Sequence, residues 1–190
     1  MAWSILIFLL LAACVAVLVY NRLVQARNSF QNAFSQIGVQ LTRRHDLVPN
    51  LVETAKGYLK HESDTFARVT QARNQAAAAL PSATPQNTAE LAQAENLLMQ
   101  ALRAVQVQLE AYPELQAAEN MRLLSEEIAG TENRVAFARQ AYNDAAMEYN
   151  TLIQMFPHNL IAAQTGHKQP AALLEFDDMA DISQTPQVRF

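Results

Sequence analysis

The hydrophobic pattern of the first 44 residues predicts one long helix. Eighteen consecutive residues, Trp3 to Tyr20, carry no charged side chain, and at the α-helical rise such a run is roughly 27 Å long, about the thickness of a bilayer's hydrocarbon core. Beyond Tyr20 the apolar residues recur at steps of three and four as far as Leu41, which keeps one stripe along a helix. We therefore expect a transmembrane helix that continues unbroken into a bundle.

The residues around position 46 predict the end of this helix, between Thr42 and His45. Asp46 is a candidate N-cap, and Pro49 would then lie in the first turn of a new helix, where its missing N–H costs little. A second apolar stripe runs from there to Leu80. Because the connection would be only a few residues long, the second helix should run antiparallel to the first.

Two further helices follow a charge-free loop at residues 81–88, which is rich in turn formers. The third carries its apolar stripe over residues 91–112 and ends before Pro113, because the residue preceding a proline disfavours the helical conformation. The fourth keeps heptad spacing from Met121 to Phe156, with Thr131 as its polar exception. The predicted fold is all-α: a transmembrane helix continuous with a long antiparallel four-helix bundle of two hairpins.

Beyond Pro157, prolines and Gly166 predict an irregular C-terminal tail. A short helix is expected at residues 159–164, an apolar latch onto the bundle at 173–176, and an extended or mobile end at 186–190. The predicted organisation is thus an anchor at residues 1–20, a bundle at 21–156 and a tail with short helical pieces at 157–190.

The charge pattern predicts the orientation in the membrane. Residues 1–80 hold eight Lys/Arg against four Asp/Glu, whereas the remainder holds six against fourteen; either the two hairpins present complementary faces to each other, or the basic one meets anionic lipid. Four arginines follow the span before the first acid, which by the positive-inside rule places the N-terminus outside and the bundle in the cytoplasm. These are our candidate membrane or partner contacts: Arg22, Arg27, Arg43 and Arg44. For the last two, a helix C-terminus that favours positive charge is the alternative explanation.

Cys14 leaves a different topology open. Leu11-Ala12-Ala13-Cys14 resembles a lipobox, in which the cysteine is acylated after cleavage, and this would place the domain outside the membrane. A basic segment does not precede the apolar run, and the run continues to Tyr20 instead of opening into a polar tether, so we favour a retained anchor.

The sequence contains few candidates for chemistry. The four histidines, at positions 45, 61, 158 and 167, form no pair at helical spacing, and His61-Glu62 with Asp64 is better explained as a solvated helix face than as a cation site. Phosphate-binding and nucleophile-elbow motifs are absent from the sequence. We expect no catalytic residues, no metal, no cofactor and no nucleic-acid binding.

Several stretches together resemble the LemA family of bacterial membrane-anchored proteins. They are Tyr20-Asn21-Arg22-Leu23, the run from Arg43-Arg44-His45-Asp46 through Pro49-Asn50 to Gly57-Tyr58, Ala72-Arg73-Asn74, Ala111-Tyr112-Pro113-Glu114-Leu115, Glu119-Asn120, Thr131-Glu132-Asn133-Arg134, Tyr142-Asn143-Asp144 and Phe156-Pro157-His158-Asn159-Leu160-Ile161-Ala162. The tail departs from the family pattern, because Gly166-His167-Lys168 stands where a Gly-Phe-Lys step is usual. The resemblance implies a single-pass protein of the bacterial inner membrane with a long antiparallel helical domain.

Two functions follow as expectations. One is a non-enzymatic scaffold whose copies associate side by side through helix faces, forming a homo-oligomer that organises or remodels the lipid bilayer. The alternative is a monomeric or small-oligomer adaptor that regulates another membrane protein, such as a protease or a sensor.

Overall fold

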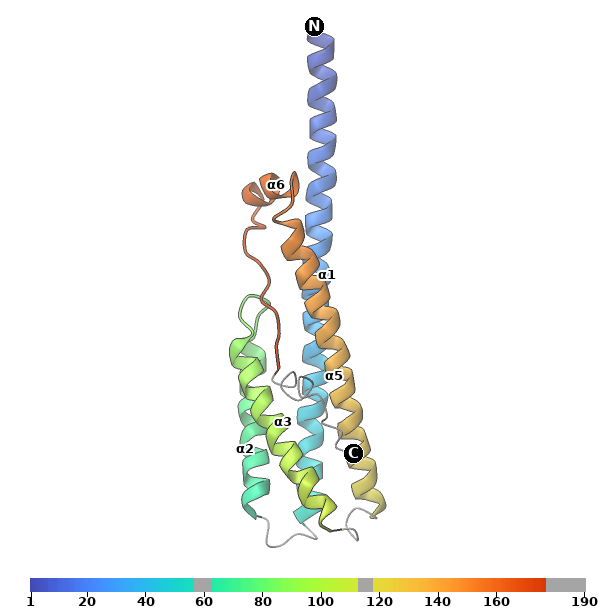
Figure 1. The fold of residues 1–190 in the computed structure, drawn as a ribbon, viewed down its shortest axis with the longest axis vertical. Coiled ribbons are helices and arrows are strands. Elements are labelled where there is room, and N and C mark those ends of the chain that lie inside the picture. Colours follow the sequence, from blue (N-terminus) through green and yellow to red (C-terminus); the bar gives the residue numbers. More distant parts are fainter. Residues whose placement is uncertain (57–62, 113–117, 177–190) are drawn as a thin grey trace, which may run out of the picture.

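The protein is all-α, as predicted. The computed structural model describes residues 1–56, 63–112 and 118–176, and within those ranges it contains helices and no β-strand. The helices are α1 (Ala2–Lys56), α2 (Ser63–Ala79), the short 3-10 helix η1 (Leu80–Ser82), α3 (Ala89–Glu110), α5 (Glu119–Leu152) and α6 (His158–Gln164). Their order and directions make two antiparallel pairs, α1 with α5 and α2 with α3 (Figure 1).

The longest helix, α1, is the axis on which the others pack. At 55 residues it extends roughly 80 Å at the α-helical rise. The hairpin of α2 and α3 lies beside its C-terminal part, while α5 follows it much further toward the N-terminus (Figure 1). Within the described residues, the bundle therefore contains α1, α2, α3 and α5 at the end remote from the N-terminus and narrows to α1 and α5, with the tail, at the other end.

The predicted end of the first helix is wrong. α1 continues through Pro49 to Lys56, so Val48, Val52 and Ala55 belong to α1 and not to a second helix. A proline inside a helix leaves the carbonyl four residues earlier without its usual N–H donor. Here that carbonyl belongs to His45, and it accepts a hydrogen bond of 2.9 Å from Nε of Arg73 on α2. A side chain from another helix thus supplies the donor that proline lacks.

The longer α1 changes the predicted position of the first reversal and the explanation for Arg43 and Arg44. The reversal between the first two helices falls at residues 57–62, and the reversal at Pro113 falls at 113–117; both lie outside the described residues. Arg43 and Arg44 stand in the interior of α1 and not at its C-terminus. The helix-end explanation for these two arginines is therefore wrong.

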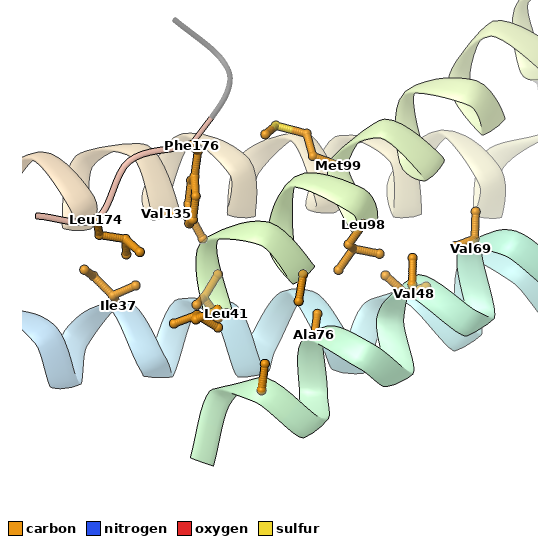
Figure 2. Close-up of a cluster of buried hydrophobic side chains, with 14 of the residues drawn as sticks. Ile37, Leu41, Val48, Val69, Ala76, Leu98, Met99, Val135, Leu174 and Phe176 are labelled. Carbon is orange, nitrogen blue, oxygen red and sulfur yellow. The ribbon is translucent and has the colours of Figure 1, made fainter. Parts of the chain in front are cut away.

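The main core joins α1, α2, α3, α5 and the tail, whereas α6 packs in a smaller, separate cluster. Ile37 and Leu41 of α1 meet Leu98 of α3, Val135 of α5 and Leu174 of the tail (Figure 2). The predicted stripes on α3 and α5 supply most of the buried positions, although Tyr112 and Phe156 at their ends are exposed. The predicted latch is confirmed, because Leu174 and Phe176 are buried in this core.

Aromatic contacts mark the seam between α1 and α5. The rings of Phe30 and Tyr149 have centroids 4.8 Å apart, and those of Phe34 and Tyr142 are 5.3 Å apart. Both tyrosines are buried. Their heptad spacing correctly predicted that they belong to the core.

The apolar start of α1 is free of the bundle. Its side chains are exposed as far as Leu18, apart from the partly buried Ala16, and α1 is long and apolar enough to cross a membrane. Figure 1 shows this part of the helix projecting alone beyond α6. Cys14 lies on the projecting part. An exposed apolar surface of this length is costly in water and favourable in lipid, which supports membrane anchoring.

Candidate functional site

A buried ion network connects α1 to α3 at the level of Arg44. Glu95 of α3 accepts hydrogen bonds at both carboxylate oxygens, from Arg44 Nη2 at Oε2 and from His45 Nε2 at Oε1, the latter at 2.7 Å. Glu95 is fully buried, and Arg44 and His45 are each only 3% exposed. An ionised carboxylate is expensive to bury without partners, so its two donors are what make this position tolerable.

Arg73 extends the network to α2. While its Nε donates to the carbonyl of His45, its guanidinium also lies 3.9 Å from the carboxylate of the exposed Asp46. His45 is thus held by its side chain to α3 and by its backbone to α2. Three helices that are distant in sequence are fixed in one register at this level.

The other predicted arginines lie on the surface. Arg22 forms an ion pair of 2.5 Å with Glu148, and Arg43 one of 3.1 Å with Glu127, so both connect α1 to α5. Arg27 is exposed on α1, near Tyr149 and His167. These pairs support the interpretation that basic and acidic halves face each other within the bundle. A membrane or partner contact stays a prediction for these three, whereas Arg44 is enclosed with Glu95.

A second polar arrangement holds the tail against α5. Asn150 both donates to the carbonyl of Ala171 (2.9 Å) and accepts from its N–H (2.8 Å). Asn143 does the same with Leu174, at 3.1 and 2.9 Å. Seven residues of helix rise roughly 10.5 Å, and three residues of extended chain span roughly 10 Å, so the two asparagines match the two backbone positions. The tail is therefore held through hydrogen bonds to its backbone as well as through its buried apolar side chains.

Tyr142 also holds the tail against α5, and its buried hydroxyl leads us to predict that the fold loses stability in alkali. Its hydroxyl donates to the carbonyl of Ala172 at 2.5 Å, and burial raises its pKa to about 12. Because the folded pKa exceeds the unfolded value near 10, the contribution is complete below pH 10 and is lost as pH rises toward 12, by at most about 3 kcal/mol. Thermal unfolding followed by circular dichroism across this range should show a smaller alkaline loss in Tyr142→Phe. Tyr112→Phe, at an exposed position, is the control, and an unchanged alkaline loss in Tyr142→Phe would contradict the prediction.

A cavity of about 270 Å³ opens between α3 and α5 beside the ion network. Leu102, Leu109 and Met121 contribute apolar walls, and Arg44 reaches it from α1. Acidic and basic side chains both line it, and among them Arg122 forms ion pairs with Glu126 and with Glu119 outside the lining. The cavity therefore presents mixed charge around an apolar interior.

The described residues offer no assembled metal site, since no group of three His, Cys, Asp or Glu side chains comes together among them. His61 and Glu62 lie outside the described residues. In the buried network the carboxylate and its donors already bind one another, and their burial separates them from solvent. This arrangement suits the fixing of helix register.

Sequence reasoning missed Glu95. It stands four residues after Leu91 and three before Leu98, on the buried stripe of α3, so a lone acid on an apolar face was the available signal. Such an acid requires a buried cation, but the sequence does not show which basic residue supplies it, since Arg44 lies 51 residues away. The roles of Arg73 and Asn150 gave no comparable signal, because their partners are backbone atoms of distant segments.

Fold and network together define a class: a helical bundle built along a membrane-capable helix and tied by buried polar contacts. The LemA family model matches residues 33–190, so the chain belongs to the LemA family.

Individual relatives agree with this assignment. The chain is 27% identical over 142 residues to protein LemA of Metamycoplasma hominis, an alignment that covers 75% of this chain and 63% of the relative. It is 26% identical to magnetosome protein MamQ 2 of Paramagnetospirillum magneticum and 25% identical to magnetosome protein MamQ of Magnetospirillum gryphiswaldense, each over 79% of this chain and 62% of the relative. The chain thus spans a little over six tenths of the length of these relatives.

Proposed function

We propose that this protein is a non-enzymatic, membrane-anchored helical scaffold that self-associates and organises or remodels the membrane. The observation that carries the proposal is the continuity of α1, which passes from an apolar, unpacked segment into the far end of the bundle without interruption. Because one unbroken helix both crosses the bilayer and forms the axis of the bundle, a movement of the bundle also moves the membrane segment. From Tyr20 to Lys56 the rise is roughly 55 Å, which leaves long lateral faces for neighbouring copies.

The lateral faces carry apolar side chains that the fold does not use. Phe137 on α5 is 72% exposed, and Leu123, two heptads earlier, shares its side of the helix. Large apolar residues are also exposed on α1 and α3, at Val39 and Val107. Side-to-side packing of copies would remove such surface from water, as the core of a protein interface does.

The orientation follows from charge. We assign the protein to the bacterial inner membrane as a single-pass protein with its bundle in the cytoplasm, since the arginines beyond the span, beginning with Arg22 and Arg27, favour the cytoplasmic side. Protease added to spheroplasts should leave the bundle intact. Digestion of the bundle would instead support the topology in which Cys14 is acylated.

Self-association predicts a sensitive position at Phe137. In mild detergent at micromolar concentration the full chain should be oligomeric, and Phe137→Asp should lower its mean mass because it places a charge in an apolar contact. Asn133→Asp introduces the same charge one turn away on the same side of α5 without removing an apolar group, and it should retain the oligomer. Light scattering coupled to size-exclusion chromatography measures both.

Two results would contradict the scaffold. A monodisperse monomer at micromolar concentration would remove the basis for self-association. A stoichiometric foreign protein recovered by crosslinking, without self-association, would support the adaptor that regulates another membrane protein. Electron microscopy of reconstituted vesicles then tests whether the oligomer changes membrane shape.

A further inference from the structure

The turn between α5 and α6 lies beside the residues of α1 where its apolar run ends. We call residues 153–164, from the end of α5 to the end of α6, the elbow. Its Ala162 is buried against Val19 and Leu23 of α1, in a small apolar cluster separate from the main core. Tyr20, the last residue of the apolar run, packs edge-on against His167 with ring centroids 6.1 Å apart. Figure 1 shows α6 as the element that reaches furthest toward the N-terminal part of α1.

The elbow exposes large apolar side chains close together. Phe156 is 77% exposed, Met155 and Leu160 are at least half exposed, and all three fall within six consecutive residues. Other exposed apolar residues of the bundle, such as Val39 or Phe137, are separated along the helices. A concentrated apolar surface indicates a contact that the isolated chain does not make.

The backbone of the elbow is built to hold this shape. Gly166 has a positive φ of 79°, and the N–H of His167 bonds the carbonyl of Ala162 at 3.1 Å, which together end α6 in the manner of a Schellman motif. At the other end, the N–H of Asn159 bonds the carbonyl of Met155 at 2.8 Å. Phe156 and Leu160 are thus presented by an ordered turn.

The charge around the elbow suits an anionic surface. No Asp or Glu occurs between Glu148 and Glu175, while Lys168 follows α6 and Arg27 lies on the adjacent turn of α1. Burial of the ring and the nearby Arg27 charge lower the pKa of His167, so that its imidazole is neutral at pH 7. The positive charge beside the elbow therefore comes from Arg27 and Lys168.

We propose that the elbow inserts Met155, Phe156 and Leu160 into the same bilayer that α1 crosses, giving the protein a second, peripheral membrane contact. Ala162 packs within one helical turn of the end of the apolar run, roughly 6 Å along the helix, and amphipathic surface segments bury their apolar faces roughly 5–10 Å into the boundary between headgroups and acyl chains. A second contact beside the spanning helix restrains the tilt of the bundle, which one spanning helix does not fix alone. The inference rests on the membrane anchoring in the proposed function and is independent of self-association.

Tryptophan quenching by brominated lipid tests the insertion directly. The chain has one tryptophan, Trp3, so Trp3→Phe gives a silent background for Phe156→Trp. The full chain is reconstituted into vesicles of phosphatidylcholine and phosphatidylglycerol whose acyl chains carry bromine. At the depth given above, Trp at position 156 should lose about half of its fluorescence or more relative to unbrominated vesicles. Leu160→Trp is a second reporter of the same elbow.

Two controls make the outcome decisive. Phe137→Trp, equally exposed but far along α5, should not be quenched, and Trp3 of the unmodified chain should be quenched if α1 crosses the bilayer. Quenching at Trp3 without quenching at positions 156 and 160 overturns the elbow contact and leaves the anchor intact. Loss of quenching at Trp3 overturns the anchor as well, and therefore both proposals.

Discussion

Replacement of Glu95 by leucine is expected to destabilise the fold by about 3–5 kcal/mol, because it leaves Arg44 and His45 buried without their shared acceptor. For a chain of this size that corresponds to a fall in Tm of roughly 6–20 °C. Circular dichroism of the full chain in mild detergent measures it. The effect should be large although the substitution increases apolar volume in a core position.

The surface pair offers a matched control for this prediction. Glu127→Leu removes the acceptor of Arg43, but both groups are about half exposed, so the loss should stay below about 1 kcal/mol. Replacing Arg44, His45 and Glu95 together by apolar residues should recover much of the stability lost in Glu95→Leu, since no buried charge then remains unpaired. Equal Tm losses in Glu95→Leu and Glu127→Leu would show that the buried network contributes no more than a surface ion pair.

Most of the buried helix faces could be predicted from local pattern alone. The stripe from Leu23 to Leu41, the heptads of α5 and the latch at Leu174 all follow from spacing, because each element must bury one face against the others. The short helix α6 was predicted at residues 159–164 and is observed at His158–Gln164. Such features depend on neighbours in sequence, and a sequence shows them directly.

The failures share a different cause. Glu95 lies 50 and 51 residues from its two partners, and the tail lies 21 and 31 residues from the asparagines that hold it. Each of these contacts becomes visible only when the helices are placed beside one another. Several motif residues that carry the family resemblance have their explanation here: Arg44, His45, Arg73, Tyr142 and Asn143 all satisfy buried polar groups. These contacts fix the position of each helix along its neighbours.

Pro49 shows most clearly how a distant residue limits prediction from sequence. Proline does disfavour a helix interior, but Arg73 of α2 compensates for it here. Proline costs an interior helical position about 3 kcal/mol relative to alanine, partly through the hydrogen bond that it removes. In this protein the orphaned carbonyl of His45 is buried and is satisfied by Arg73. The helix therefore continues, and α1 remains one rod from the membrane segment to the remote end of the bundle.

The dependence of Pro49 on Arg73 predicts a measurable coupling. Arg73→Leu should cost about 1–3 kcal/mol, since a buried carbonyl loses its donor. In a Pro49→Ala background the backbone N–H of residue 49 can bond that carbonyl instead, so the same Arg73→Leu change should cost less than about 1 kcal/mol, the remainder reflecting Asp46 and packing. A double-mutant cycle on Tm isolates the difference. Purely additive losses would mean that Arg73 stabilises the bundle by some route other than the His45 carbonyl, and that α1 tolerates its proline without help from α2.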